Sequence, residues 1–459
     1  MSDKSLEDVL QRVGSAVKLL RESQTGPYIY PVVPTEFSNW RDEQRAWRET
    51  AILFNQSYHM TDMYVEGPDA PKVLERLGVN SFKDFGPDKA KQFVACNYDG
   101  YVIGDVVLFH LEQNRFNLVG RPSVHNWVQY HCETGKYDVK LERDERTVAR
   151  PGPIVRKVYR YQVQGPNALK VMEKVTGKPV PSVKFFGMAD FTIAGKRVRA
   201  LRHGMVGQPG FELFGPWEDG ESVKTAIVDA GKDLGLRLSG SRTYSSNTLE
   251  SGWIPSPMPA IYSGEKMKAY RQWLPANGYE ANASLGGSFS SPNIEDYYLT
   301  PWDLGYGMVV KFDHDFIGRE ALEKMAARPP RRKKVTLALN SEDVQRGIAT
   351  MYGPHPRTKY IDFPSAVYST LPYDKVMKDG KVIGVSTWIG YSANEGRELT
   401  LAIVDAEHAE PGTEVTFVWG EEGGGSSKPT VERHKQLEIR ATVAPVPYSE
   451  PARASYRVS

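Results

Sequence analysis

The sequence predicts an α+β protein with a separate, strand-rich C-terminal region, and three observations lead to this class. The chain has 459 residues, more than one hydrophobic core usually supports, so two or three domains are expected. Strand-like and helix-like segments up to about residue 330 do not alternate regularly, which argues against a doubly wound sheet. Beyond the proline-rich basic stretch ARPPRRKK (327–334), which is typical of a domain boundary, the segments are largely strand-like.

The first half of the chain gives the mixed pattern. MSDKSLEDVLQRVGSAVKLL (1–20) predicts a capped amphipathic helix. Short apolar and polar bursts from about 50 to 135 predict strands, with Asp99-Gly100 as a turn between two of them. The run 157–177 then predicts a strand, a Gly-Pro turn and a helix closed by Gly177.

The later segments complete the prediction. FTIAGKRVRALRHG (191–204) predicts a hairpin, and SVKTAIVDAGKDLGL (222–236) predicts a helix. RTYSSNTLESGW (242–253) is rich in Ser and Asn, and we expect a loop there. From about residue 331 onward the strand-like runs KKVTLALN, ELTLAIV and TEVTFVWG predict a small β domain.

Composition excludes several functional classes. The 58 basic and 56 acidic side chains give a net charge of +2 without a basic block, so no nucleic-acid partner is expected. No run approaches the ~18 apolar residues of a membrane span, and the N-terminus lacks the apolar core of a signal peptide. We therefore expect a cytoplasmic protein. The two cysteines form no CxxC pair and the nine histidines no HExxH or HxH spacing, so no dedicated metal site is expected.

Several motifs occur in an order that resembles the aminomethyltransferase (glycine-cleavage T-protein) superfamily of tetrahydrofolate enzymes. They are Gln164-Gly165-Pro166, Gly210-Phe211-Glu212-Leu213, TPWDLGYGMVVKFDHDFIGREAL (300–322), and DGKVIGVSTWIGYS (379–392) with PGTEVT (411–416). The resemblance implies that residues 1–330 form a folate- and substrate-binding body of two interleaved α+β subdomains arranged as a ring. It also implies that residues 331–459 form a C-terminal β-barrel domain and that tetrahydrofolate is the cofactor.

Further stretches resemble the aryl O-demethylase branch of this superfamily, which acts on vanillate, 3-O-methylgallate or syringate. They are YPVVPTEFSNW (30–40), NTLESGWIPSP (247–257), YRQWLPANGYE (270–280) and GGSFSSPNIEDYY (286–298). The glycine-cleavage proteins carry paired aspartates where this chain has Gly104-Asp105, which puts the usual aminomethyl chemistry in doubt. The implied reaction moves a methyl group from a methoxybenzoic acid to N5 of tetrahydrofolate.

Tyr244 matches the position of the catalytic tyrosine of this branch. A departing phenol and a tyrosine both have a pKa of about 10, so a proton passes between them at little cost. We therefore expect Tyr244 to donate a proton or a hydrogen bond to the ether oxygen. Without the resemblance, a loop tyrosine packed on the core would explain this residue.

Five residues are expected to hold the aromatic acid. Arg121 follows a strand and is expected to bind the substrate carboxylate, although a surface arginine would have the same sequence signal. Tyr28 and Tyr30 alternate in an extended segment and would share one face. Gln56 and His59 match the substrate pocket of the branch, and core tyrosines and a structural histidine remain the alternatives.

Three residues are expected to hold the folate. Glu212 matches the residue that binds the pterin, because a carboxylate accepts two adjacent N–H groups. Gln164 is expected to hydrogen-bond the pterin or aminobenzoyl group, and Trp253 to form an aromatic wall. Glu250 is assigned a structural role through backbone N–H groups, whereas Asp105 either orients the folate or satisfies a turn.

The leading hypothesis is a tetrahydrofolate-dependent O-demethylase of methoxybenzoic acids. Syringate is favoured over vanillate because Pro122-Ser123-Val124-His125 beside Arg121 departs from the smaller version of vanillate-type relatives. One alternative is another folate-dependent demethylase, for a sulfonium or methylamine substrate, or an aminomethyltransferase. An arginine in the pocket argues against a cationic substrate. The other alternative is a folate-binding module without catalysis.

Overall fold

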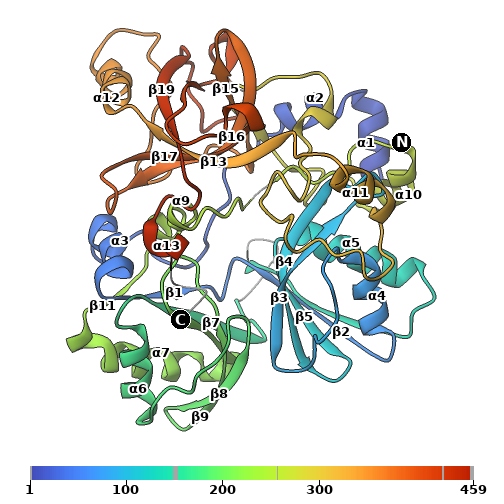
Figure 1. The fold of residues 1–459 in the computed structure, drawn as a ribbon, viewed down its shortest axis with the longest axis vertical. Helices are drawn as coiled ribbons and strands as arrows, with labels where there is room; N and C mark the ends of the chain where they lie inside the picture. Colours follow the sequence, from blue (N-terminus) through green and yellow to red (C-terminus); the bar gives the residue numbers. More distant parts are fainter. Residues whose placement is uncertain (1–2, 148–153, 256, 426–427, 455–459) are drawn as a thin grey trace.

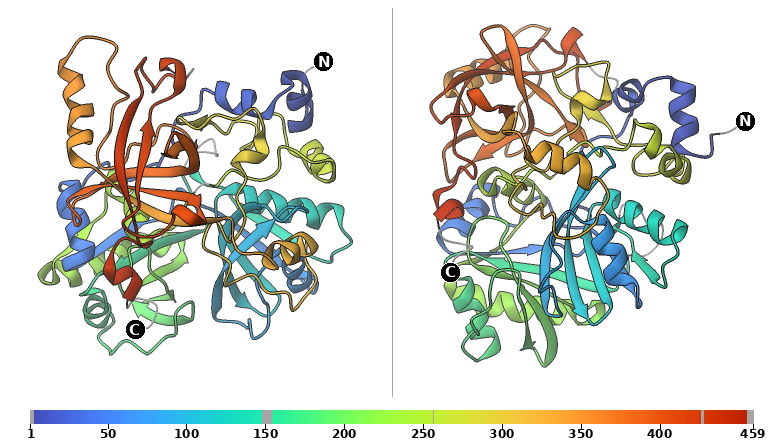
Figure 2. Two further views of the ribbon diagram at one scale, coloured as in Figure 1. Left: turned by 45° about the horizontal axis from the view of Figure 1, so that its top comes forward. Right: turned by 45° about the vertical axis from the view of Figure 1, so that its right-hand side comes forward.

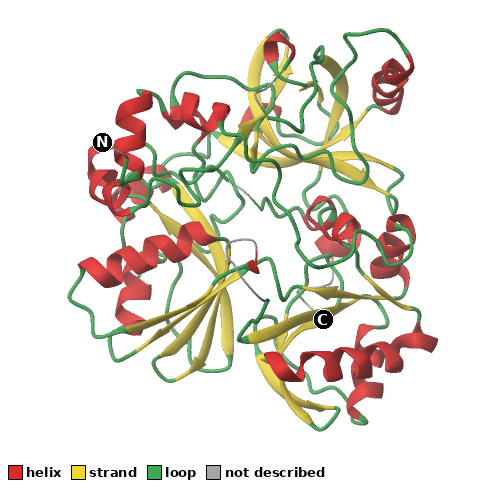
Figure 3. Ribbon diagram, turned by 180° about the vertical axis from the view of Figure 1, so that it is seen from behind, coloured by secondary structure: helices red, strands yellow, loops and turns green. Residues whose placement is uncertain are grey.

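The computed structural model describes residues 3–147, 154–255, 257–425 and 428–454. These residues form three β-rich lobes that surround a middle region of loops (Figure 1). The lobes remain distinct in two further views (Figure 2), and a view from behind shows loops and turns gathered where the lobes meet (Figure 3). The predicted α+β class is confirmed.

The N-terminal segment differs from its prediction as a single helix over 1–20. It forms α1 (Leu6–Val13) and α2 (Ala16–Glu22). Gly14 ends α1 in the left-handed conformation, with φ of 76°, which glycine adopts without steric strain. The side chain of Ser15 then accepts a hydrogen bond from the backbone N–H of Lys18 and starts α2.

The first lobe contains a five-stranded antiparallel sheet in the order β3-β4-β5-β2-β6. Its strands are β2 (Thr61–Glu66), β3 (Lys89–Cys96), β4 (Val102–Glu112), β5 (Arg115–Gly120) and β6 (Lys140–Asp144). The predicted turn at Asp99-Gly100 joins β3 to β4. Helices α4 (Ala70–Leu77) and α5 (Pro122–Thr134) contribute buried apolar residues to the same core as these strands.

The second lobe contains a six-stranded sheet in the order β11-β1-β7-β10-β9-β8. Its strands are β1 (Ala51–Asn55), β7 (Val158–Gln164), β8 (Met188–Ile193), β9 (Lys196–Arg202), β10 (Gly210–Pro216) and β11 (Leu236–Leu238). The predicted hairpin is β8–β9. Helices α6 (Ala168–Thr176) and α7 (Gly220–Gly231) pack their apolar residues against this sheet.

The third lobe is a closed six-stranded barrel, as the resemblance implies. Its strands are β13 (Arg332–Leu339), β15 (Asp374–Lys378), β16 (Lys381–Ser392), β17 (Arg397–Asp405), β18 (Glu414–Trp419) and β19 (Leu437–Ala444). Pairing of β13 with β19 closes the barrel and leaves no open edge in it. The first barrel strand begins just after the boundary that we predict near residue 330.

The segment 242–253 is not the loop that its Ser and Asn content predicts. It contributes to two short helices, α8 (Ser241–Tyr244) and α9 (Asn247–Ser251), and α9 ends at Gly252. Its local sequence lacks an apolar helical period, and packing supplies what the sequence signal lacks. Thr243 is fully buried and its hydroxyl donates to the carboxylate of Glu43, which also accepts from the backbone N–H of Gly240.

Glu250 connects α9 to two other parts of the chain. Its carboxylate accepts hydrogen bonds from Trp47, Arg48, Ser392 and Asn394, at 2.8–3.0 Å. Trp47 and Arg48 belong to α3 (Trp40–Glu49), and Ser392 ends β16 of the barrel. The structural role predicted for Glu250 therefore has a different basis, because its partners are side chains rather than backbone N–H groups.

Candidate active site

Tyr244 lies at the end of α8, where its side chain enters an aromatic cluster. Its ring centroid is 4.4 Å from that of Tyr30, 4.9 Å from that of His59 and 5.5 Å from that of Phe54. Nε2 of Gln56 donates a hydrogen bond of 3.1 Å to the Tyr244 hydroxyl. The structure thus brings together four residues that the sequence predicted for one site, namely Tyr30, Gln56, His59 and Tyr244.

Burial decides the protonation state of this cluster. Only 8% of Tyr244 is exposed, and burial together with Tyr30 raises the pKa of its phenol well above the ordinary range. Burial, reinforced by Arg121, lowers the pKa of His59 to about 3. At neutral pH both groups are therefore uncharged, and each retains a proton that it can donate in a hydrogen bond.

The other predicted substrate residues adjoin this cluster. The rings of Tyr28 and Tyr30 meet edge to face at 5.9 Å, and the Tyr28 hydroxyl donates to the backbone carbonyl of His59. Arg121, which precedes α5, places its guanidinium carbon 4.3 Å from the centroid of the Tyr28 ring. Arg121 also lines a pocket together with Asp105 and Tyr279. All five predicted substrate residues therefore belong to one chain of contacts, in which Tyr30, Gln56 and His59 touch Tyr244 and Tyr28 links Arg121 to Tyr30.

Glu212, the predicted pterin residue, lies on β10 with a buried carboxylate. Arg160, on the neighbouring strand β7, donates to its Oε1, and Nδ1 of His203 lies 3.6 Å from its Oε2. Burial opposes the charged form, yet Arg160 and His203 hold the pKa of Glu212 below its usual value. The carboxylate is therefore ionised at neutral pH, and the long His203 contact leaves Oε2 able to accept further hydrogen bonds.

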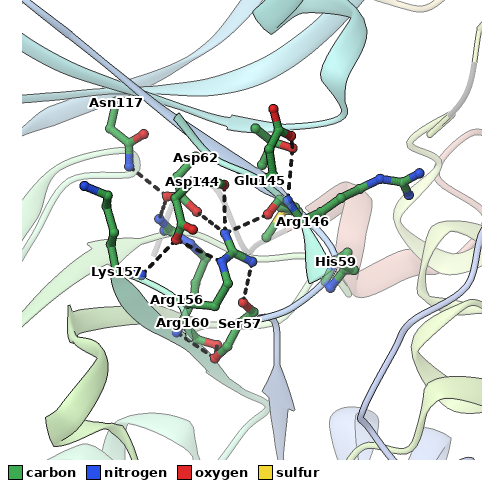
Figure 4. A network of polar contacts seen from close by, with 12 residues as sticks. Ser57, His59, Asp62, Asn117, Asp144, Glu145, Arg146, Arg156, Lys157 and Arg160 are labelled. Carbon is green, nitrogen blue, oxygen red and sulfur yellow. Dashed lines mark hydrogen bonds and ion pairs between the residues drawn. The ribbon is translucent and has the colours of Figure 1, made fainter. Parts of the chain in front are cut away.

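Behind these residues lies a buried ionic network (Figure 4). Asp62, on β2, accepts from Arg160 at 2.8 Å and from Arg156 at 3.1 Å. Arg156 also pairs with Asp144 at 2.9 Å and donates to the backbone carbonyl of Ser57 at 2.7 Å. The network thus joins the strand that carries Asp62 to the strand that carries Glu212. It was not predicted from the sequence, because Asp62 lies far along the chain from the two arginines that it pairs with.

The side chain of Gln164, which was expected to hydrogen-bond folate, is already hydrogen-bonded to the backbone of a loop. Its Oε1 accepts the backbone N–H groups of Met205 and Val206, and its Nε2 donates to the carbonyls of His203 and Gln208. These four bonds fix the loop between β9 and β10. The contact predicted between Gln164 and folate remains a prediction, and the structure adds a role in holding Met205.

Met205 is a residue of the site that the sequence did not indicate. Its sulfur lies 2.9 Å from Nε2 of Gln56 and 3.6 Å from the Tyr244 hydroxyl. Methionine is flexible and polarisable, and it fills irregular gaps in apolar surroundings. The segment Gly204-Met205-Val206-Gly207 contains no sequence signal that the methionine faces the tyrosine.

Trp253 and Asp105 form the remaining predicted part of the site. Nε1 of Trp253 donates to Oδ2 of Asp105 at 3.1 Å, and Tyr306 donates to the same oxygen at 3.0 Å. Burial raises the pKa of the Asp105 carboxyl, and its hydrogen-bond donors oppose the shift. Trp253 is 38% exposed, so part of it is accessible to a ligand.

Comparison with known proteins places this geometry in a family. The GCVT N-terminal domain model matches residues 22–256. The chain is 59% identical to a syringate O-demethylase of Sphingobium sp. strain SYK-6, with 99% of this chain and 98% of that protein covered. It is 31% identical to a sesamin methylene transferase of a Sinomonas species, with 91% and 90% covered.

More distant relatives agree with this assignment. An aminomethyltransferase of Clostridium botulinum is 28% identical, with 83% of this chain and 85% of that protein covered. The crystal structure of the glycine cleavage system aminomethyltransferase T from Bartonella henselae shares the fold, with a TM-score of 0.59, 17% identity and 97% of both chains covered. The chain belongs to the GCVT family. Within that family, its resemblance to the aryl O-demethylase branch is confirmed.

Proposed function

We propose that this protein is a tetrahydrofolate-dependent O-demethylase of methoxylated benzoic acids, with syringate as the favoured substrate. The observation that carries the proposal is the uncharged, protonated Tyr244 within one aromatic cluster that also holds Arg121, Gln56 and His59. The full-length match to a syringate O-demethylase supports the same substrate class. The products are 5-methyltetrahydrofolate and a phenolic acid.

The residues present suit a folate. Glu212 offers an ionised carboxylate oxygen to the N–H groups of a pterin, and the partly exposed indole of Trp253 offers aromatic surface. Oε1 of Gln56, in the part of the site expected to hold the aromatic acid, is buried and has no hydrogen-bond partner among the residues that the structure describes. A hydrogen-bond donor of a bound ligand would supply that partner. When bound, tetrahydrofolate supplies N5, the nucleophile that accepts the methyl group.

The protein's own residues then have two tasks. The first is to align the ether with the acceptor, which aromatic packing by Tyr30 and charge pairing by Arg121 achieve by fixing the aromatic acid. The second is to move a proton: the electrons of the methyl C–O bond leave with the aryl oxygen, and the Tyr244 hydroxyl protonates that oxygen. Gln56 donates to the Tyr244 oxygen, so the tyrosine hydrogen is not used in that bond. Its acceptor among the described residues is the sulfur of Met205 at 3.6 Å, a weak acceptor that the ether oxygen would replace in this step.

The test is incubation of the purified protein with tetrahydrofolate and syringate carrying deuterated methoxy groups. We expect mass spectrometry to find one deuterated methyl group on the folate for each demethylated acid. Vanillate and 3-O-methylgallate are assayed alongside to rank the substrates. Absence of transfer from every methoxybenzoate would refute the proposal, and tight folate binding without transfer would favour a binding module.

A further inference from the structure

A second arginine, Arg146, lies beside the predicted carboxylate-binding residue. It follows β6, and its guanidinium carbon is 4.7 Å from the centroid of the Tyr28 ring and 5.4 Å from that of Tyr279. Arg121 lies 4.3 Å from the centroid of the same Tyr28 ring. Two guanidinium groups therefore share one aromatic ring of the site, and Tyr279 lines a pocket together with Arg121.

The acidic residues next to Arg146 are engaged with other groups. Asp144 pairs with Arg156 at 2.9 Å, and Glu145 pairs with Arg143 at 2.7 Å. Glu145 also accepts a hydrogen bond from Thr61 at 3.0 Å. Figure 4 shows the side chain of Arg146 pointing away from the ionic network that holds Asp144.

Arg146 itself has donors to spare. Its Nε is buried and has no hydrogen-bond partner within the described part of the chain. A partly desolvated guanidinium without a paired anion is unfavourable, so this position favours the arrival of an anionic group. The positive potential extends into the site, since Arg121 and Arg146 both contribute to the lowered pKa of His59.

We propose that Arg146 binds the carboxylate of the aromatic acid together with Arg121, and so determines the preference for benzoic acids over neutral aryl ethers. This inference rests on the function proposed above. Tyr30 lies between Tyr28 and Tyr244 in a row of ring contacts of 5.9 and 4.4 Å. The arginines are thus at the end of the row opposite Tyr244, as an aromatic acid requires when its ether oxygen meets the tyrosine.

The glutamate tail of folate also carries carboxylates, so the same chemistry has a second source. The position of Arg146 over the Tyr28 ring favours the aromatic acid over the glutamate tail as its ligand. The same ring contacts Tyr30 and lies under Arg121, and both of these residues are expected to hold the aromatic acid. The experiment separates the two sources by varying each ligand. Syringate is compared with its uncharged methyl ester, and tetrahydrofolate is titrated independently.

The test measures kcat and KM for Arg146→Gln and Arg146→Lys, and the Kd of syringate by calorimetry without folate. We expect Arg146→Gln to raise the KM and Kd of syringate about tenfold or more, since a hydrogen bond to a charged group is lost. The KM of the methyl ester and of tetrahydrofolate should stay within about twofold. Arg146→Lys should recover part of the loss, because it keeps the charge without the planar fork.

Arg41→Gln is the matched control. Its guanidinium lies 4.9 Å from the centroid of the Trp40 ring, but on the exposed surface of α3. We expect no change for either substrate in this variant. Equal losses for syringate and its ester would show a structural role and overturn the inference. A rise confined to the KM of tetrahydrofolate, or no rise at all, would also overturn it. Demethylation of syringate by the wild-type protein tests the proposed function separately from the role of Arg146.

Discussion

Nε2 of Gln56 donates a hydrogen bond of 3.1 Å to the hydroxyl of Tyr244, and this contact holds the tyrosine oxygen in place. Gln56 is held in turn, since its backbone N–H donates to the carbonyl of Arg160 at 2.8 Å. The sulfur of Met205 completes a triangle with these two groups, because it lies 2.9 Å from Nε2 of Gln56 and 3.6 Å from the tyrosine hydroxyl, which donates to it.

Tyr244→Phe removes the proposed proton donor. We expect kcat to fall by about 10²–10⁴-fold, the usual contribution of a positioned acid, while the Kd of syringate changes little. Steady-state kinetics and calorimetry measure the two quantities. Tyr159→Phe is the matched control, because the Tyr159 hydroxyl is buried and has no hydrogen-bond partner among the described residues. Full activity of Tyr244→Phe would remove this tyrosine from the chemistry.

Glu212→Gln separates folate binding from substrate binding. The amide cannot accept at both positions as the carboxylate does, so we expect the Kd of tetrahydrofolate to rise about tenfold or more. The Kd of syringate, measured without folate, should change less. Glu218→Gln serves as the control, since Glu218 follows the same strand but lies in an exposed turn. Unchanged folate affinity would contradict the role that we assign to Glu212.

Asp62→Asn tests the buried network. Asp62 neutralises both Arg156 and Arg160, which are almost fully buried, and its loss leaves their charges undercompensated. We expect the free energy of unfolding to fall by about 3–5 kcal/mol in urea titrations. Asp190→Asn is the comparison, because its pair with Arg197 is exposed and should contribute less than ~1 kcal/mol. Equal effects of the two substitutions would argue against a structural role for the network.

The pH dependence of stability should reflect His59. Its pKa is about 3 in the folded protein and about 6.5 in an unfolded chain, so the unfolded state binds more protons between these values. The free energy of unfolding is therefore not reduced by His59 above about pH 6.5. It falls as the pH is lowered toward 3, by up to ~1.4 kcal/mol per pH unit. Urea unfolding from pH 7 to 5 measures the slope. His59→Gln should make it shallower, and an unchanged slope would contradict the buried, neutral state.

Several elements could be predicted because their signals are local. The Asp99-Gly100 turn, the 191–204 hairpin and the strands of the C-terminal barrel follow from alternation and turn residues alone. The segment 242–253 could not be predicted in this way. Its two short helices depend on partners outside the segment, among them Glu43 from α3.

The candidate site was predicted by motif rather than by contact. The resemblance selected Gln56, His59 and Arg121, and alternation in an extended segment selected Tyr28. The structure links all four to Tyr244 through a chain of contacts. The residues that support the site belong to no motif; they are Asp62, Arg146, Arg156, Arg160 and Met205. In the sequence they cannot be told from surface charges and core methionines, and only the pairing of distant strands brings them together.

The sequence by itself determined the α+β class, the separate C-terminal barrel and the family, because these depend on local periodicity and on motifs in fixed order. Only the tertiary structure decided which charges are buried and paired, and therefore which groups are ionised. Glu212 stays charged beside Arg160, whereas Tyr244 and His59 stay neutral. The physical reason is that desolvation and charge pairing depend on distance in space, which positions in the sequence do not give.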